Sequence, residues 1–366
     1  MWGSAEATDP QNGGSSLVNA AEIVLHGLSA AAVRNVVEVG AADGDLTEVL
    51  LDRATAQGGR VTAIDPAPSE RLVELAARRP ELELVPRTSL EALPHLPAAD
   101  AVILDGDHNY FTVSEELRLL AAPAADTAVP LIVLHDIGWP HARRDTYYEP
   151  DRIPESLRQP FVRDATLSPS ETGIADGGLP FGCAAKQEGG PRNGVLTALE
   201  DFLATRDDLR FASVPVFWGI GFIWPRTAPF SAGLAEALAP YAESPLLERL
   251  EAHRVAHLVE LCEVEKRLSD LYGVERHNAM ILHAQRLLLA RMVGSSAFGL
   301  AERLSRLRQR GEPMFSRERV EEVLELDQRI AVDPPGGRGS ADNGDPANGG
   351  ASGGGPAAER AQSGAS

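Results

Sequence analysis

The 366-residue chain is long enough for about two domains and carries a formal net charge of −19. Its hydrophobic fraction of 43% is ordinary for a globular protein, which excludes a wholly unfolded chain. Lysine occurs only at Lys186 and Lys266, and no basic run is present. Proteins that follow phosphates need a concentrated basic surface, so we expect no nucleic-acid partner.

Neither end of the sequence nor its apolar runs indicate a membrane or secreted protein. Residues 1–16 lack the basic segment and apolar stretch of a signal peptide. The longest apolar run, residues 214–224, is about half as long as a bilayer-spanning helix. Cys183 and Cys262 lie in no metal-binding or redox spacing, which favours free thiols. We therefore expect a cytoplasmic protein without membrane contact.

Composition divides the chain into four zones. Residues 1–16 are polar and predict a flexible leader, whereas residues 17–225 alternate short β-branched runs with helical patterns. Residues 226–332 are rich in Leu, Glu, Arg and Ala, and predict a helical region. Residues 333–366 consist mostly of small and polar residues that cannot bury enough apolar surface to offset chain entropy, so they predict a disordered tail.

The second zone predicts an α/β fold. Its buried-strand candidates are, in chain order, residues 33–39, 60–64, 82–85, 101–104 and 130–134. Helical patterns between them cover residues 45–56, 69–79 and 113–121. Short apolar strands alternating with helices indicate a Rossmann-like, doubly wound parallel sheet covered on both faces. A helix over 193–205 follows, and two further runs, 211–217 and 220–224, predict a terminal antiparallel hairpin.

The third zone predicts a helical appendage. Ser244 and Pro245 suit the start of a helix. Leucine and valine then recur at steps of three and four residues, at Leu258, Leu261, Val264, Leu268 and Leu271. Such an amphipathic face packs against the core or against a second subunit, so a homo-oligomer formed through this region is one of two expectations.

The first two predicted strands end in residues that suit a nucleotide-like ligand. Glu38 and Gly40 begin a turn that reaches a second glycine, Gly44, and Asp65 ends the next strand. Small residues let the backbone approach a ligand, and a carboxylate at a second strand end can accept both ribose hydroxyls. The Gly-x-x-x-Gly spacing differs from the Gly-x-Gly-x-x-Gly of dinucleotide folds.

This pattern resembles the class I S-adenosylmethionine (SAM)-dependent methyltransferases, with five parallel strands and a terminal hairpin. The resemblance implies that Glu38 and the loop from Gly40 to Gly44 hold the methionine part of SAM. It also implies that Asp65 binds the ribose and that Ser89 contacts the adenine. The complete set of implied cofactor-binding residues is Glu38, Gly40, Ala41, Gly44, Asp65, Ser89 and Asp105.

The fourth and fifth predicted strands end in acidic residues and histidines. In a parallel sheet the carboxyl ends of the strands share one edge, so these groups are expected to face the same crevice. Asp105, His135 and Asp136 predict a divalent-metal site for Mg²⁺, or for Mn²⁺ because of the imidazole. His135 could instead orient Asp136 without touching the metal. His108 is the candidate base that takes a proton from a metal-bound hydroxyl.

These strand ends resemble the macrocin and mycinamicin sugar O-methyltransferases, with the cephalosporin hydroxylase-like proteins nearby. The resemblance implies that Asp105 and Asp136 are metal ligands and that His108 is the base. His135 stands where the best-understood members carry glutamate. The resemblance covers roughly residues 30–140 and 195–225.

Residues 138–192 form an unusually long connection, which begins with a segment rich in aromatic residues and arginine. We interpret it as a lid over the acceptor, with an oligomer contact as the alternative. Asn193, at its end, is expected to cap the next helix.

The sequence thus predicts a SAM-dependent O-methyltransferase, assisted by a metal, that acts on a hydroxyl of a sugar, glycan or glycosylated small metabolite. Its expected partner is accordingly a small-molecule or carbohydrate acceptor. Two alternatives remain at this point. One is an NAD-dependent oxidoreductase of similar architecture, and the other is a non-catalytic interaction protein whose helical region carries the function.

Overall fold

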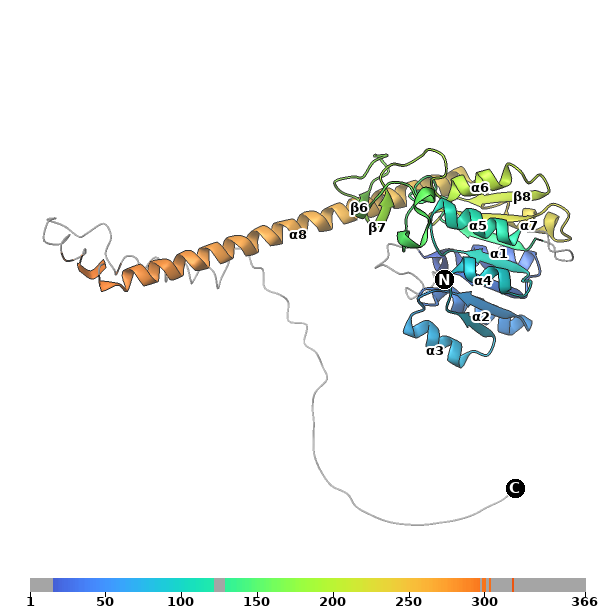
Figure 1. Cartoon of the computed structure of the whole chain (residues 1–366), viewed down its shortest axis with the longest axis horizontal. Coiled ribbons are helices and arrows are strands. Elements are labelled where there is room, and N and C mark those ends of the chain that lie inside the picture. The colour runs from blue at the N-terminus through green and yellow to red at the C-terminus, as the bar shows by residue number, and fades with distance from the viewer. Residues whose placement is uncertain (1–15, 122–128, 297, 301–302, 304–317, 319–366) are drawn as a thin grey trace, which may run out of the picture. The chain divides into compact units, whose positions relative to one another are not determined.

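The computed structural model describes residues 16–121, 129–296, 298–300, 303 and 318 (Figure 1). The predicted tail, all of the predicted leader except Ser16, and most of residues 297–332 lie outside the described residues. The chain divides into two compact units, Met1–Leu271 and Tyr272–Ser366.

The first unit is built on a seven-stranded sheet with the order β3-β2-β1-β4-β5-β9-β8. Its strands are β1 (Asn35–Val39), β2 (Arg60–Ile64), β3 (Leu82–Val85), β4 (Ala101–Leu104), β5 (Leu131–His135), β8 (Leu209–Val214) and β9 (Ile220–Pro225). The first five pair in parallel, whereas β9 runs antiparallel to both β5 and β8. This arrangement confirms the predicted Rossmann-like sheet and its terminal hairpin.

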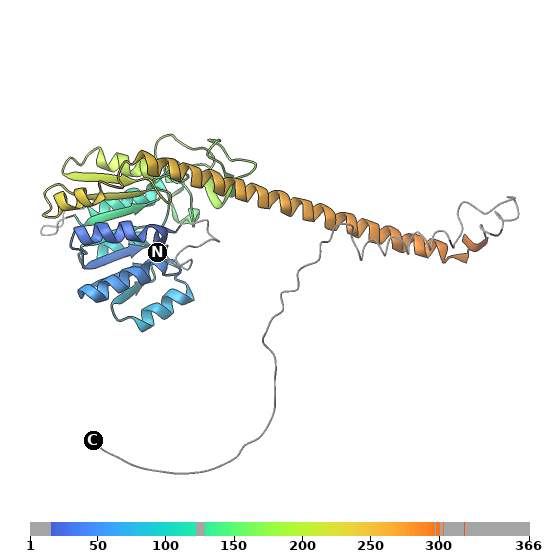
Figure 2. The same cartoon turned by 180° about the vertical axis from the view of Figure 1, so that it is seen from behind.

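Helices cover both faces of the sheet, as the continuously apolar strands require (Figures 1 and 2). On one face lie α1 (Ala21–Ala30), α2 (Asp45–Gln57), α3 (Glu70–Arg78) and α7 (Ser231–Leu238), with the 3₁₀ turn Leu17–Ala20. On the other lie α4 (Ser89–Ala92), α5 (Tyr110–Leu120) and α6 (Val195–Leu203), with the 3₁₀ turn Leu93–His95. Every residue of β4 and β5 is buried between these layers.

A carboxyl group is buried in the second layer without full hydrogen bonding. Glu116 on α5 is 1% exposed, and its Oε1 has no hydrogen-bond partner among the described residues. Burial raises the pKa of Glu116 to about 8, although a hydrogen bond from the Ser89 side chain opposes the shift. The folded protein therefore keeps this proton over a pH range in which the unfolded chain has lost it.

We expect Glu116→Gln to stabilise the protein increasingly as pH rises from 5 to 8. The raised pKa makes the native state bind more protons than the unfolded state, so the wild-type free energy of unfolding falls with pH by up to about 1.4 kcal/mol per unit. Glutamine removes this term, which urea unfolding at pH 5 and pH 8 would measure. The half-buried neighbour Glu115, paired with Arg118 at 2.7 Å, is the control, and Glu115→Gln should change stability by less than about 1 kcal/mol at either pH. Equal effects of the two substitutions would contradict the account.

The hairpin that closes the sheet has a longer turn than the sequence predicted. β8 ends at Val214, and Phe217, Trp218 and Gly219 all adopt left-handed backbone conformations before β9 begins. The carboxylate of Glu251, on α8 (Pro245–Val293), accepts hydrogen bonds from the backbone N–H groups of Phe217 and Trp218 at 3.0 and 2.9 Å. Helix α8 thereby holds this uncommon turn in place.

Helix α8 starts at Pro245, as predicted, but only part of its predicted apolar face is covered. Val255, Leu258 and Val259 pack against Leu179 and Trp218. The remaining predicted positions, Leu261, Val264, Leu268 and Leu271, are exposed. In the second unit the described residues 272–293 continue as helix, and their apolar side chains are largely exposed. Packing against a second subunit stays a prediction. None of the described helices is long and apolar enough to cross a membrane.

The long connection after β5 has structure of its own. It contains 3₁₀ turns at Pro150–Arg152 and Glu155–Leu157 and an antiparallel pair of strands, β6 (Phe161–Leu167) and β7 (Leu179–Ala185). Arg144 belongs to this connection and is only 1% exposed. Its guanidinium donates to the carbonyl oxygens of Ala185 at 2.6 Å, Thr172 at 2.6 Å and Gly173 at 3.1 Å. One buried cation thus ties together the parts of the insertion.

We expect Arg144→Met to destabilise the insertion by about 3 kcal/mol or more, because it leaves three carbonyl oxygens without their charged donor. Limited proteolysis of the folded protein should then cut within residues 145–190. The adjacent Arg143, whose side chain is 38% exposed and pairs with Glu200, supplies the matched control. Arg143→Met should cost less than about 1 kcal/mol and leave the cleavage pattern unchanged. Equal protection in both variants would show that Arg144 does not organise the insertion.

Candidate active site

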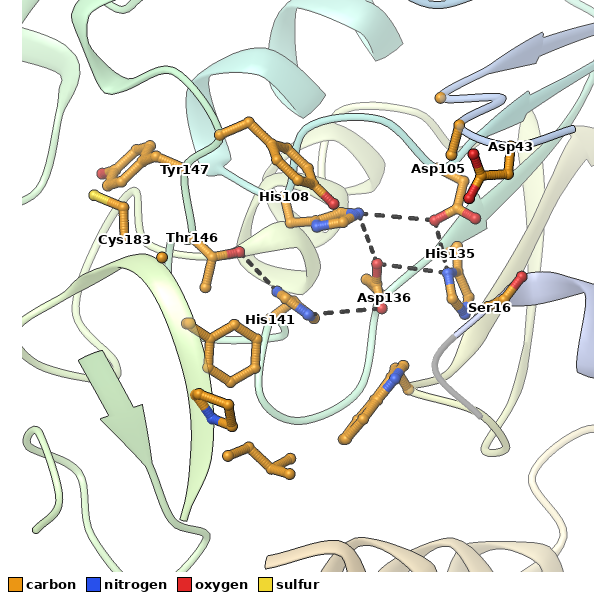
Figure 3. Close-up of a pocket in the computed structure, with 18 of the residues that line it drawn as sticks. Ser16, Asp43, Asp105, His108, His135, Asp136, His141, Thr146, Tyr147 and Cys183 are labelled. Carbon is orange, nitrogen blue, oxygen red and sulfur yellow. Dashed lines mark hydrogen bonds and ion pairs between the residues drawn. The ribbon is translucent and has the colours of Figure 1, made fainter. Parts of the chain in front are cut away.

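A cavity of about 930 Å³ opens at the carboxyl ends of the parallel strands (Figure 3). Three parts of the first unit line it. The loop after β1 contributes one wall, the ends of β4 and β5 contribute the floor, and the insertion with α8 contributes the remaining wall. Its lining includes Glu38, Gly40, Ala41, Asp105, His108, His135, Asp136, His141, Tyr148, Phe181, Trp218 and Leu258.

The loop after β1 lies against the end of β4. Gly40 has a φ of +84°, and a Cβ atom there would lie 2.1 Å from the carbonyl oxygen of Asp105. The turn therefore needs glycine for both its backbone conformation and this close approach. Gly44 is also left-handed, at φ +82°, and precedes the first turn of α2. Its backbone N–H donates to the carbonyl of Ala41 at 2.7 Å, which closes the turn.

Two acidic side chains form hydrogen bonds at the two ends of the loop after β1 and the start of α2. Glu38 is 2% exposed and accepts a hydrogen bond from the Thr47 hydroxyl at 2.6 Å. Burial raises the pKa of Glu38 to about 8, with the Thr47 hydroxyl opposing and Asp105 adding to the rise. Asp65, at the end of β2, accepts from the backbone N–H of Ala42 at 2.9 Å. Both side chains therefore fix the loop that the sequence assigned to the cofactor.

The structure gathers some of the predicted cofactor residues around the cavity and leaves others outside it. Glu38, Gly40, Ala41 and Asp105 line the cavity. The other three, Gly44, Asp65 and Ser89, do not line it, although Asp65 contacts the loop through Ala42. Ser89 is buried in the first turn of α4.

The ends of β4 and β5 bring two carboxylates and two histidines into a ring (Figure 3). His108 Nε2 lies 2.8 Å from Asp136 Oδ2 and 3.7 Å from Asp105 Oδ1. His135 Nδ1 lies 2.8 Å from Asp105 Oδ1 and 3.5 Å from Asp136 Oδ2. The four residues predicted for the chemistry from two separate strand ends are thus within contact of one another.

The ring is buried, and each side chain alters the protonation of the next. Burial alone would lower the pKa of His135, but Asp105 and Asp136 raise it to about 9. Burial likewise opposes the charge of His108, whereas Asp136 and Asp105 raise its pKa well above the ordinary value. The histidines in turn hold the pKa values of both carboxyls below normal, against the effect of burial. The acidic pair is therefore ionised at neutral pH.

The backbone beside the ring fixes the orientation of His135. Its Nε2 lies 2.6 Å from the carbonyl oxygen of Phe217, in the left-handed turn that Glu251 holds. A carbonyl accepts only, so Nε2 carries a proton and donates it, and Nδ1 is the atom presented to the carboxylates. Histidines that bind metals commonly donate their second ring nitrogen in this way.

A third histidine, His141, was missed by the sequence reasoning. It comes from the start of the insertion and is 7% exposed. Its Nδ1 lies 2.8 Å from Thr146 Oγ1, and its Nε2 lies 3.9 Å from Asp136 Oδ1. Burial lowers the pKa of His141 to about 3, with Asp136 opposing the shift, so the ring is neutral. His141 follows Asp136 closely in the sequence, but it lies within residues 138–192, which the sequence analysis interprets as a lid.

The residues present fit a divalent cation. Ligand atoms of Asp105, His135 and Asp136 lie within 4.8 Å of one another, and so do those of His108, Asp136 and His141. Asp136 is 3% exposed, and its Oδ1 accepts no hydrogen bond from the described residues. A buried carboxylate oxygen without a donor is costly unless a cation or an unseen group contacts it.

Apolar side chains also line the cavity. Phe181, from β7, and Trp218, from the terminal hairpin, face it together with Leu258 of α8. Tyr148 lies beside His108, with a distance of 5.7 Å between the two ring centroids. The insertion and α8 therefore form the wall opposite the loop after β1.

Residues 37–137 match the model of a methyltransferase-domain family. No curated protein matches the chain. Among solved structures, the chain is similar to the SAH-bound methyltransferase PaMTH1 of Podospora anserina, at 12% identity and a TM-score of 0.36 over 58% of this chain and 80% of that one.

Two further solved structures match this chain over about half of their own length. Human N-acetylserotonin methyltransferase in complex with SAM matches at 12% identity and a TM-score of 0.32, over 57% of this chain and 52% of that one. The mitomycin 7-O-methyltransferase MmcR matches at 17% identity and a TM-score of 0.30, over 57% and 55%. The family match over residues 37–137, together with the strand order of the sheet, supports a class I SAM-dependent methyltransferase.

Proposed function

We propose that this protein is a SAM-dependent O-methyltransferase, assisted by a divalent cation, that methylates a hydroxyl of a sugar, glycan or glycosylated small metabolite. One observation carries the proposal. His108, a candidate base, lies 2.8 Å from Asp136 in the same cavity that the glycine loop after β1 lines. A group able to take a proton and a loop able to hold SAM therefore face the same cavity.

The loop after β1 would hold the methionine part of SAM, and Asp65 would receive the ribose. When bound, SAM would supply an electrophilic methyl group for the acceptor oxygen. Gly40 lets the loop after β1 pack against the end of β4, since any side chain at residue 40 would collide with the backbone of Asp105. Glu38 and Asp65 keep the loop in place through Thr47 and Ala42.

His108 would take the proton from the acceptor hydroxyl in its neutral form, which a cation at Asp105 and Asp136 would favour by offsetting the charges that raise the pKa of His108. Asp105, His135 and Asp136 would hold a divalent cation, which would lower the pKa of that hydroxyl. Asp136 orients the imidazole of His108 and stabilises the imidazolium formed when it accepts the proton. Phe217 holds His135 through its carbonyl oxygen, so that Nδ1 keeps facing the carboxylates.

The wall formed by the insertion and α8 suits an acceptor with both apolar and polar faces. Aromatic rings of Tyr148, Phe181 and Trp218 offer flat surfaces on which the C–H face of a sugar ring can pack. The same wall would exclude water from the reaction. The oligomer-contact interpretation of residues 138–192 stays a separate prediction.

Transfer of labelled methyl groups from SAM into fractionated extract of the native host tests the proposal. We expect label in a carbohydrate-containing fraction, a strong decrease on chelation, and recovery on adding a divalent cation. His108→Ala should lower incorporation by about 10²–10⁴-fold while SAM still binds. Incorporation that is equal in the variant and the wild type would overturn the role of His108. Label found only in protein or nucleic acid would overturn the acceptor class.

A further inference from the structure

The insertion contributes a histidine to the cluster at the strand ends. His141 leaves the backbone just after β5, and its Nε2 points to the carboxylate of Asp136 (Figure 3). Ligand atoms of His141, Asp136 and His108 lie within 4.8 Å of one another. His141 thereby approaches the one carboxylate that also belongs to the group with Asp105 and His135.

Two contacts prepare His141 for ligation. Thr146 Oγ1 lies 2.8 Å from Nδ1, so that ring nitrogen has a partner and Nε2 is left facing Asp136. On its other side Asp136 Oδ1, in a residue 3% exposed, has no hydrogen-bond donor among the described residues. A histidine with one nitrogen fixed and the other facing an unsatisfied buried carboxylate oxygen has the outer hydrogen bond typical of metal-binding histidines.

We propose that His141 is an additional ligand of the cation, so that the site combines two imidazoles, from His135 and His141, with the carboxylates of Asp105 and Asp136. This inference rests on the proposed function for what the cation does. It goes further by naming a ligand on the insertion and by assigning the cation's class. Oxygen-only sites suit Mg²⁺, whereas imidazole nitrogens favour Mn²⁺, Fe²⁺, Co²⁺ or Zn²⁺.

The donor set also links the insertion to the sheet. Asp105 and Asp136 follow β4 and β5, whereas His141 and Thr146 belong to the insertion, which Arg144 organises. A cation bound by both parts would hold the start of the insertion, residues 141–146, against the ends of β4 and β5. The wall that contains Phe181 would then be anchored beside the reacting groups.

Binding of Co²⁺ and Mg²⁺ to the full-length apoprotein tests the proposal without turnover. We expect calorimetry to give tighter binding of Co²⁺ than of Mg²⁺ by at least tenfold, and the visible spectrum of bound Co²⁺ to show nitrogen ligation. His141→Ala should weaken Co²⁺ binding by at least tenfold, change that spectrum, and leave Mg²⁺ binding less affected. Thr146→Val should change the spectrum in the same direction to a smaller extent.

Matched variants separate ligation from other effects. His95→Ala, which removes an exposed histidine outside the cavity, should leave Co²⁺ affinity and spectrum unchanged. Circular dichroism and SAM affinity identify any variant that fails to fold.

Each result decides one of the two proposals. An unchanged Co²⁺ spectrum in a folded His141→Ala variant overturns the ligand assignment, and so does equal or tighter binding of Mg²⁺ by the wild type. Both leave methyl transfer possible, and hence the proposed function intact. A His141-dependent Co²⁺ spectrum in a protein that neither binds SAM nor transfers methyl groups would support the ligand assignment and contradict the proposed function.

Discussion

Asp136→Asn is expected to lower the rate of methyl transfer by about 10³-fold or more, with little change in SAM affinity. The carboxylate contacts His108, His135 and His141, so its loss removes the negative charge that holds all three. Removing one member of a buried charge cluster costs about 3–5 kcal/mol, and losing a positioned base costs about 10²–10⁴-fold in rate. Single-turnover transfer of labelled methyl groups measures the effect directly.

The backbone at Asp136 makes asparagine the right substitution. Asp136 has a φ of +61°, and asparagine tolerates this left-handed conformation better than other residues with a side chain. Asp164 offers a matched control, because it is also left-handed, at φ +52°, but is exposed on β6 outside the cavity. Asp164→Asn should retain full activity. A loss of similar size in both variants would assign the effect to the backbone instead of the charge.

The second large effect is expected for Gly40→Ala, which should abolish measurable SAM binding and reduce stability by about 3 kcal/mol or more. A Cβ atom at residue 40 would lie 2.1 Å from the carbonyl oxygen of Asp105 and 2.7 Å from the Cα of Gly106. The backbone of Gly106 and Asp105 cannot move away without shifting the end of β4. Overpacking and the left-handed conformation each add a cost of about 1–3 kcal/mol.

Gly58→Ala separates these two costs. Gly58 is left-handed, at φ +66°, but a Cβ there would meet no atom within 4 Å. The control should therefore lose only about 1 kcal/mol, the conformational term, and bind SAM normally. Urea unfolding and calorimetry on the two variants give both quantities. Equal destabilisation would show that the contact between Gly40 and Asp105 contributes nothing.

Much of the sheet, and the part of the cavity formed by the ends of β4 and β5, could be predicted because the sequence signals for them are local. Continuous apolar runs predicted β4 and β5, and their ends placed Asp105 and Asp136 at one edge of the sheet. The glycine turn after β1 needed only the identities of Gly40 and Gly44. These inferences depend on the alternation of strands and helices, which determines where the ends of the strands meet. They do not depend on the details of side-chain packing.

Contacts across the chain could not be predicted in the same way. Glu251 holds the turn at Phe217, and Phe217 holds His135, yet these residues come from three elements with no shared sequence pattern. The assigned helix cap, Asn193, was wrong for a similar reason. Gly194 precedes α6 instead, and Asn193 donates to the carbonyl oxygens of Gln187 and Gly189 within the insertion.

His141 shows the same limit at the site itself. Its role depends on the fold of the insertion, whose strands β6 and β7 the sequence did not reveal. Burial in that fold and the contact with Thr146 place its Nε2 beside Asp136. Only the assembled insertion brings these features together.

Calorimetric titration of the purified protein with SAM tests the central claim most directly. We expect saturable binding by the wild type and a loss of at least tenfold in affinity for Asp65→Ala, which removes the proposed ribose acceptor and the contact with Ala42. Asp164→Asn should bind as the wild type does. Absence of SAM binding by folded wild-type protein, with and without a divalent cation, would contradict the account.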